Sequence, residues 1–97
     1  MTGIQTNSWI FLAIALASQQ EPADIKGISQ IADGINHAVP TQKELRSSIN
    51  WLMDHGYIRE HNSKYTLTKK GMIDYTFASL NTNIILNIWR NLERQLK

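Results

Sequence analysis

The sequence predicts a mainly α-helical domain with one small two-stranded β-ribbon. Two observations support this fold class. Apolar residues recur at helical spacing in several segments, and residues 41–71 show the pattern of a capped helix, a stop, two short strands and a further helix. At 97 residues the chain is expected to be a single domain over 1–97, with its core at 8–80 and a C-terminal dimerisation helix at 82–96.

The predicted helix at 41–55 has clear start and stop signals. Thr41 is followed three residues later by Glu44, a capping-box pattern in which each side chain accepts a hydrogen bond from the other residue's backbone N–H. An apolar stripe then follows, formed by Leu45, Ile49, Leu52 and Met53. Gly56 can adopt the left-handed conformation that ends a helix. The helix is therefore expected to stop near His55.

A short β-ribbon is predicted at 57–68. Residues 57–59 and 64–67 are rich in β-favouring types, and residues 61–63, His-Asn-Ser, have turn chemistry between them. Thr68 can cap another helix.

This order of elements resembles the winged helix-turn-helix of small bacterial regulators of the MarR and PadR kind. The resemblance covers about the middle half of the chain. It is carried by these residues: Leu45, Ile49, Leu52, Gly56, Tyr57, Ile58, Tyr65, Leu67, Thr68, Lys70 and Gly71. It implies a winged helix-turn-helix with flanking N- and C-terminal helices, in which 41–55 is the recognition helix and 57–68 is the wing.

The N-terminal run Trp9–Ala17 is uninterrupted and apolar. It resembles the hydrophobic region of a signal peptide, yet no lysine or arginine precedes it, and a membrane span needs roughly 20 apolar residues. We therefore expect a buried first helix capped by Asn7 or Ser8. A helix apolar on all sides needs cover on several faces, so we also expect it to reach a subunit interface.

The remaining segments predict three more helices. Residues 28–36 form an apolar face after Asp24-Ile25, which is either a short first strand or a helix cap. The helix that begins at Thr68 or Lys69 has these residues to bury: Met72, Ile73, Tyr75, Thr76, Phe77 and Leu80. Residues 81–83, Asn-Thr-Asn, either restart a capped helix or form a polar patch within one longer helix.

Positive charge is concentrated in the middle of the chain. The net charge of +2 is too mild to indicate nucleic acid by itself. Residues 41–70, however, hold six cations against three anions, whereas residues 1–40 hold one against three. The excess falls on the predicted recognition helix and wing.

A helical wheel places a set of polar side chains opposite or beside the core face of 41–55. Arginine and lysine can donate to guanine, and asparagine or glutamine can pair with adenine, in the major groove. The wing and the following helix add cations for the phosphate backbone or an adjacent minor groove. The predicted DNA-binding residues are Gln42, Lys43, Arg46, Ser47, Asn50, Arg59, Lys64, Lys69 and Lys70. Trp51, on the other flank, is expected to be a packing residue.

Other chemistries have little support in the sequence. The histidines are dispersed, cysteine is absent, and no nucleophile motif or glycine-rich phosphate loop is present. We therefore expect no enzyme activity, no cofactor, no metal site and no membrane span, and a cytoplasmic location.

The sequence thus predicts a homodimeric, sequence-specific regulator of transcription that binds double-stranded DNA. The predicted dimer interface comprises Trp9, Phe11, Ile85, Ile88, Trp89, Leu92 and Leu96. The alternative is a winged-helix module that docks on another protein through Trp51, Trp89 and the terminal helices, without binding DNA.

Overall fold

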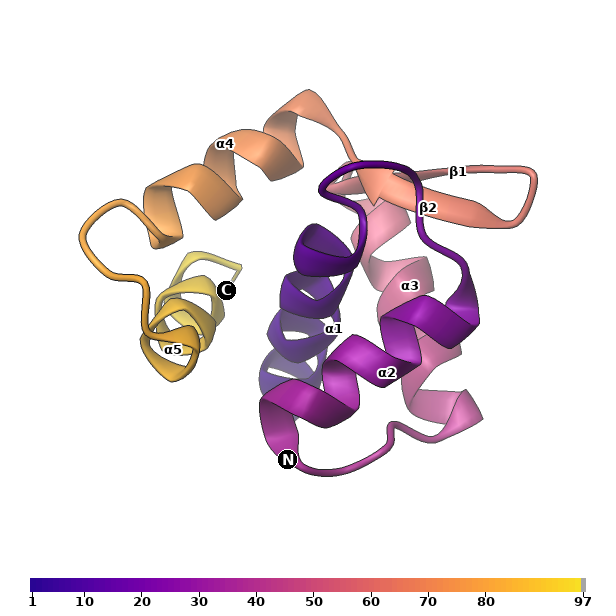
Figure 1. Cartoon of the computed structure of the whole chain (residues 1–97), viewed down its shortest axis with the longest axis horizontal. Coiled ribbons are helices and arrows are strands. Elements are labelled where there is room, and N and C mark those ends of the chain that lie inside the picture. Colours follow the sequence, from indigo (N-terminus) through magenta and orange to yellow (C-terminus); the bar gives the residue numbers. More distant parts are fainter. Residues whose placement is uncertain (97) are drawn as a thin grey trace.

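The computed structural model describes residues 1–96, over which the chain forms five helices and one antiparallel hairpin (Figure 1). The elements are α1 (Gly3–Ala17), α2 (Ile25–Asn36), α3 (Gln42–Asp54), β1 (Ile58–His61), β2 (Lys64–Leu67), α4 (Lys69–Ala78) and α5 (Ile85–Gln95). The predicted class, mainly helical with a small β element, is confirmed at this level.

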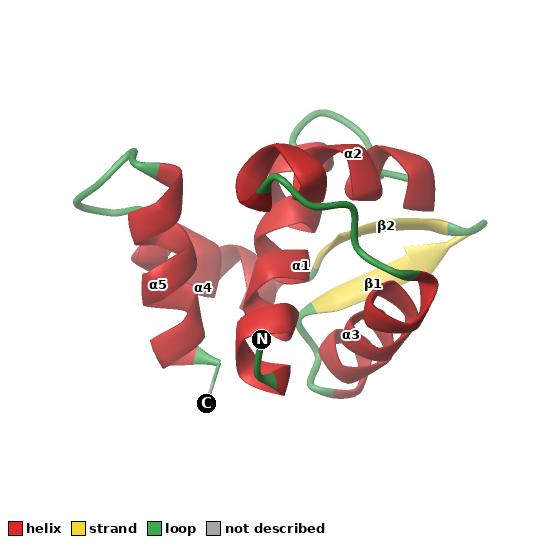
Figure 2. Cartoon of the chain, turned by 90° about the horizontal axis from the view of Figure 1, so that it is seen from below, coloured by secondary structure: helices red, strands yellow, loops and turns green. Residues whose placement is uncertain are grey.

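The first helix, α1, is the centre of the molecule. Figure 2 shows it in the middle, with α2, α3, α5 and the hairpin arranged around it. Every residue from 9 to 15 is buried, and each large apolar side chain there contributes roughly 1.5–3 kcal/mol by leaving water. The prediction of a buried first helix is confirmed. Within residues 1–96, no helix is both long and apolar enough to cross a bilayer.

Polar side chains fix how the neighbouring helices sit on α1. Ser48 Oγ (α3) donates to Asn7 Oδ1 at 2.9 Å, and Trp9 Nε1 donates to the Ala32 carbonyl (α2) at 2.9 Å. Trp89 Nε1 (α5) donates to Ser8 Oγ at 3.0 Å and to the Gln5 carbonyl at 3.2 Å. A buried polar group left without its partner costs about 1–3 kcal/mol. These bonds therefore select one alignment of each helix along an otherwise apolar surface.

The start of α1 differs from the prediction. The N-cap is Thr2, whose hydroxyl accepts from the Gln5 N–H at 3.2 Å while the Gln5 side chain accepts from the Thr2 N–H at 2.8 Å. Asn7 and Ser8, the predicted caps, lie inside the helix and are buried. The reason is that Thr2 and Gln5 complete a capping box, which leaves Asn7 and Ser8 free to bond α3 and α5.

The residues predicted to form the dimer interface lie mostly inside the protomer, which corrects that assignment. Five are 0–4% exposed, namely Trp9, Phe11, Ile88, Leu92 and Leu96, and two are half-buried, namely Ile85 and Trp89. The first and last helices pack on each other, with the Trp9 and Trp89 rings stacked 6.3 Å apart. The core therefore extends beyond 8–80 to include α5, and the chain covers α1 without a second subunit.

The hairpin is joined to the segment that precedes α2. Strands β1 and β2 pair with Ile58 opposite Leu67, and Asn62 and Ser63 form the turn at φ of 53° and 62°. Ala23 also pairs with Tyr65 through two backbone hydrogen bonds of 2.8 and 2.9 Å. Asp24 then caps α2, since its carboxylate accepts from the Gly27 N–H at 2.8 Å. The helix-cap interpretation of Asp24-Ile25 is therefore confirmed, and the strand interpretation is wrong for these two residues, because the bridge to Tyr65 is made by Ala23 just before them.

The hairpin passes directly into α4. Thr68 caps α4, as predicted, and Gly71 lies against the Tyr57 backbone, where an added Cβ would be 2.1 Å from the Tyr57 carbonyl oxygen. The helix ends at Ala78, and residues 79–84 separate it from α5. The predicted interruption at 81–83 is therefore a true break between two helices.

Candidate nucleic-acid interface

Helix α3 is built as the sequence predicts. The Thr41 hydroxyl accepts from the Glu44 N–H at 3.0 Å, and the Glu44 carboxylate accepts from the Thr41 N–H at 2.9 Å. Leu45, Ile49 and Leu52 are buried against the core, and α3 ends at Asp54 with Gly56 at φ 77°. The core face is thereby fixed, and the opposite face is left to solvent.

The five α3 residues predicted to contact DNA are all exposed, and the structure divides them into two rows. Gln42, Arg46 and Asn50 line a groove between α3 and the hairpin, of about 290 Å³. Lys43 and Ser47 are exposed but do not line it. The spacing of four residues sets Gln42, Arg46 and Asn50 in line along the helix axis. This row presents one cation and two amides side by side.

The hairpin forms the far wall of this groove through Glu60 and Tyr65, which are paired across the strands. The Tyr65 hydroxyl donates to Glu60 Oε2 at 3.5 Å. Burial raises the pKa of Tyr65, and the Glu60 carboxylate raises it further, while the Arg46 guanidinium opposes the shift. The charges of Arg46 and Glu60 thus both act on the Tyr65 hydroxyl. The groove therefore holds one anion, the Glu60 carboxylate, beside the hydrogen-bond donors of α3.

Arg59 and Lys64 lie on the other side of the hairpin. Arg59 pairs with Thr66, and Lys64 pairs with His61, in a register that places Tyr65 on the buried face. Because side chains alternate along a strand, Arg59 and Lys64 share the outer face, and neither lines the groove. The structure therefore brings these two cations together with each other and away from Gln42, Arg46 and Asn50.

The two lysines at the start of α4 have different surroundings. Both are exposed, but Lys70 Nζ donates to the His55 carbonyl at 2.9 Å and lies 4.5 Å from the centre of the Tyr57 ring. Lys70 therefore ties α4 to the end of α3, a contact that no sequence signal indicates because the two residues are fifteen apart. Lys69 carries no such contact among those described.

Trp51 is a packing residue, as predicted. It is half-buried, stacks on the His55 ring at 3.9 Å between centroids, and stacks on the Tyr57 ring at 6.1 Å. Burial raises the pKa of Tyr57, and Asp74 adds to the shift. These rings stiffen the end of α3 and leave Trp51 poorly placed as a free anchor for a partner.

The groove also includes residues that the sequence analysis did not assign to it. Tyr65 and Ile25 line it beside Leu45, Ile49 and Met53. Strand alternation alone could have placed Tyr65 on the inner face, but only the Ala23–Tyr65 pairing brings Ile25 to the same place.

The sequence and the fold were also compared with known proteins. No protein-family model matches the chain, and neither a curated protein nor a solved structure does so.

Proposed function

We propose that the chain is a winged helix-turn-helix domain that binds double-stranded DNA as a homodimeric, sequence-specific regulator of transcription. In this proposal α3 enters the major groove, and the hairpin acts as a wing on the backbone or in an adjacent minor groove. The observation that carries it is the exposed row Gln42, Arg46 and Asn50, which flanks the buried face of a capped helix and lines the groove beside the hairpin.

The dimensions of α3 suit this role. Its 13 residues make a rod of about 20 Å, and the major groove, about 12 Å wide, admits a single helix. Arginine can bind guanine, and asparagine or glutamine can bind adenine, each in a bidentate manner. The row therefore holds the donors and acceptors for a short run of bases.

The arrangement around α3 also supports the proposal. The hairpin leads from the end of α3 into α4, and a single β-bridge from Ala23 to Tyr65 joins the segment before α2 to β2. Arg59 and Lys64 on the outer hairpin face, and Lys69 at the start of α4, are exposed cations that can meet phosphates on either side of a groove.

The test is a double substitution, Arg46→Ala with Asn50→Ala, measured by fluorescence anisotropy on a duplex selected from random DNA with the wild-type protein. We expect specific affinity to fall at least about 30-fold, because each of the two lost base contacts costs about 1–3 kcal/mol. The matched control, Arg90→Ala with Asn83→Ala, removes the same two residue types from exposed positions in and just before α5 and should retain affinity. Equal affinity of the two variants would contradict the proposal.

The alternative, a docking module without DNA binding, has one observation in its favour, which is the apolar surface of α4 described below. Its predicted anchors are already engaged within the chain, because the half-buried Trp51 stacks on His55 and Trp89 donates to Ser8 Oγ. A docking module should show almost no binding to random duplex DNA at low salt, whereas a DNA-binding protein should bind it measurably.

A further inference from the structure

Helix α4 has an apolar face on each side. Gly71 and Ala78 are buried against the core, with Tyr75 half-buried between them. On the opposite side lie Met72, Ile73, Phe77 and Leu80, which are 53%, 58%, 68% and 65% exposed. At 100° per residue Met72, Ile73, Thr76 and Phe77 share one side of α4, and Leu80 lies in the turn just after the helix. We call these five residues together the α4 stripe. The sequence predicts that the residues of the α4 stripe are buried, whereas the protomer leaves them exposed.

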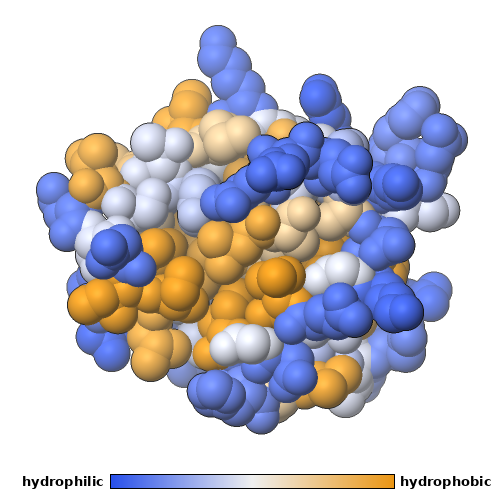
Figure 3. All heavy atoms as spheres, in the orientation of Figure 1, coloured by the Kyte–Doolittle hydropathy of each residue, from blue (hydrophilic) through white to orange (hydrophobic). Residues whose placement is uncertain are grey.

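The α4 stripe is unusually apolar for a solvent-facing helix surface. Four large side chains that are more than half exposed present on the order of 450 Å² together, within the range of the largest patch on a typical monomer, which is often functional. The stripe contains no charged residue. Figure 3 shows apolar side chains gathered over the side formed by α4 and α5 and across the middle of the face, while hydrophilic side chains predominate at the hairpin.

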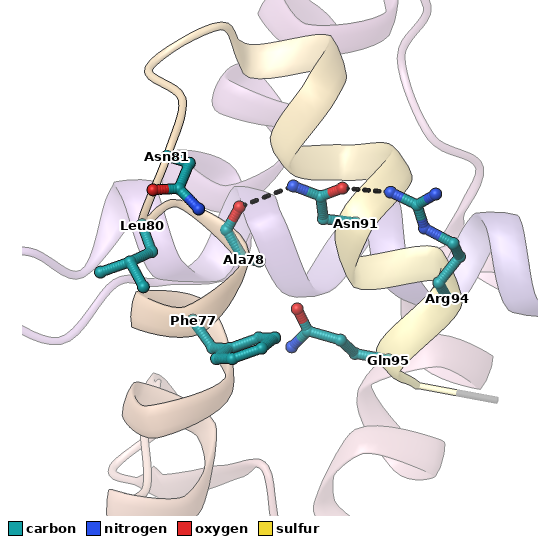
Figure 4. A pocket seen from close by; sticks show the side chains of 7 residues that line it. All are labelled: Phe77, Ala78, Leu80, Asn81, Asn91, Arg94 and Gln95. Carbon is teal, nitrogen blue, oxygen red and sulfur yellow. Dashed lines mark hydrogen bonds between the residues drawn. The ribbon is translucent and has the colours of Figure 1, made fainter.

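A shallow groove of about 360 Å³ lies beside the stripe, between α4 and α5. Figure 4 shows the Phe77 ring directed along it toward Gln95, and the Leu80 side chain directed away from the helix. Asn91 closes its floor by donating to the Ala78 carbonyl at 2.9 Å. The same surface therefore has a protruding side chain, Leu80, and beside it a groove that could accept such a side chain from another molecule.

We propose that the α4 stripe is the surface through which two copies of this chain associate, with their α4 helices antiparallel about a two-fold axis near Thr76 and Phe77. This arrangement sets the Ile73 end of each helix against the Leu80 end of the other, so the same patch serves on both subunits. The two stripes together remove about 900 Å² from water, and the flanking groove brings the contact to roughly 1,000 Å², the lower limit for a specific interface.

The charges favour a second copy over a different protein. Like copies repel where a charged surface meets itself, and the α4 stripe has no charge to repel. Antiparallel pairing also keeps Lys69, at the start of α4, about 11 Å along the helix from the proposed axis, so the two copies' lysines lie roughly 20 Å apart, beyond the screening length of about 10 Å. The surface therefore complements itself in shape, and the nearest charges do not oppose the pairing.

This inference rests on the homodimer of the proposed function and names its surface. The α4 stripe takes the place of the dimer interface predicted from the sequence, whose side chains on α1 and α5 are mostly buried within the protomer. In Figure 1, α4 lies on one side of α1 and α3 lies on the other, so pairing through α4 leaves the α3 face open on both subunits.

The first experiment is sedimentation velocity across micromolar concentrations, comparing the wild-type chain with the double variant Ile73→Gln and Phe77→Gln. Glutamine keeps helix propensity and charge, so only the apolar contact is removed. The dimer dissociation constant should rise at least 100-fold. The control, Val39→Gln, alters a side chain that is 68% exposed, as Phe77 is, but lies between α2 and α3, and it should leave the constant unchanged. A monomeric wild-type chain at 100 μM would overturn the proposal, as would a dimer that the double variant leaves intact.

A second experiment uses the absence of cysteine from the chain. Thr76→Cys places one thiol near the proposed axis and should give a disulfide-linked dimer on mild oxidation, whereas Val39→Cys should give little. Equal cross-linking of both variants would overturn the proposed geometry.

The same variants separate this proposal from the proposed function. The Ile73→Gln and Phe77→Gln variant should still bind random duplex DNA at low salt as a monomer. The Arg46→Ala and Asn50→Ala variant should still sediment as a dimer. Loss of DNA binding in an intact dimer would assign DNA binding to α3 without bearing on the dimer. Loss of the dimer with DNA binding retained would assign dimerisation to α4 without bearing on DNA binding.

Discussion

The two exposed helix faces of this protein, on α3 and on α4, differ in kind although both helices use their other face for the core. The open face of α3 presents Gln42, Arg46 and Asn50, whereas that of α4 presents Met72, Ile73, Phe77 and Leu80. Helix α3 has an ordinary amphipathic pattern, polar outside and apolar inside. Helix α4 has apolar side chains on both sides, and its own chain buries only one of the two.

This difference indicates two kinds of partner. A row of hydrogen-bonding side chains suits the polar, charged surface of DNA, which can exchange bonds to water for bonds to the protein. An uncharged apolar stripe gains most against another apolar surface, because the gain scales with the area removed from water. The four predictions below run from the largest expected effect to the smallest. Those on salt and on Glu60 test whether the two faces work independently, and those on Gly71 and the tyrosines test the packing that positions the faces.

The first prediction concerns salt. If Lys43, Arg59, Lys64 and Lys69 each meet a phosphate while Arg46 contacts a base, raising the salt from about 50 to 200 mM should lower the DNA affinity of one subunit roughly 150-fold. Self-association through α4 should change less than about threefold over the same range, because no charge is buried there. Anisotropy and sedimentation at matched salt check this. A steep salt dependence of both equilibria would contradict the division into a polar and an apolar face.

The second prediction concerns Gly71, which joins the hairpin to α4. Gly71→Ala should destabilise the fold by about 3 kcal/mol, since the new Cβ would overlap the Tyr57 carbonyl oxygen. Gly34→Ala is the matched control, because nothing lies within 4 Å of the added Cβ, and it should stabilise α2 by about 0.5–1 kcal/mol. Urea unfolding measures both variants. A neutral Gly71→Ala would show that α4 does not pack as closely on the hairpin as described.

The third prediction concerns Glu60, the anion in the groove beside α3. Glu60→Gln should raise DNA affinity about fivefold, because removing one like charge near a phosphate is worth about 1 kcal/mol. Glu93→Gln makes the same charge change on α5 and should have little effect on DNA. Neither should alter the dimer constant. Equal gains from both variants would show that net charge, and not the groove, sets the affinity.

The fourth and smallest prediction concerns alkaline pH. Burial raises the pKa of both Tyr57 and Tyr65 above the usual tyrosine value of 10.0, so the unfolded chain loses these protons at lower pH than the folded chain does. Their stabilising contribution is complete below about pH 10 and declines as pH rises through the folded pKa. Unfolding free energy measured from pH 8 to 11 should show this decline. Tyr65→Phe should make the decline shallower, and an unchanged slope would contradict the assignment to Tyr65.

Local signals in the sequence specify α3 and the hairpin closely. Thr41, Glu44 and Gly56 each act within a few residues of their position, through a cap or a left-handed turn, so their effect can be read without the fold. For the same reason Thr68 marks the start of α4 correctly. The exposure of Gln42, Lys43, Arg46, Ser47 and Asn50 likewise follows from the helical period.

What surrounds α1 could not be inferred from the sequence. An apolar run does not say which neighbours cover it, and the sequence analysis assigned part of that cover to a second subunit. In the fold, the Trp89 and Trp9 rings stack, and hydrogen bonds from Ser48 and Trp89 align α3 and α5 on α1. These partners are 41 to 81 residues apart, so no local pattern encodes their meeting.

The sequence by itself therefore determined where α3 and the hairpin begin and end, and which side chains of α3 face outward, because caps, turns and helical period are local properties. Only the tertiary structure decided that α1 is the centre, that α5 belongs to the core, and that Ile73 and Phe77 remain exposed on α4. Burial depends on which elements meet, and that depends on contacts between distant parts of the chain.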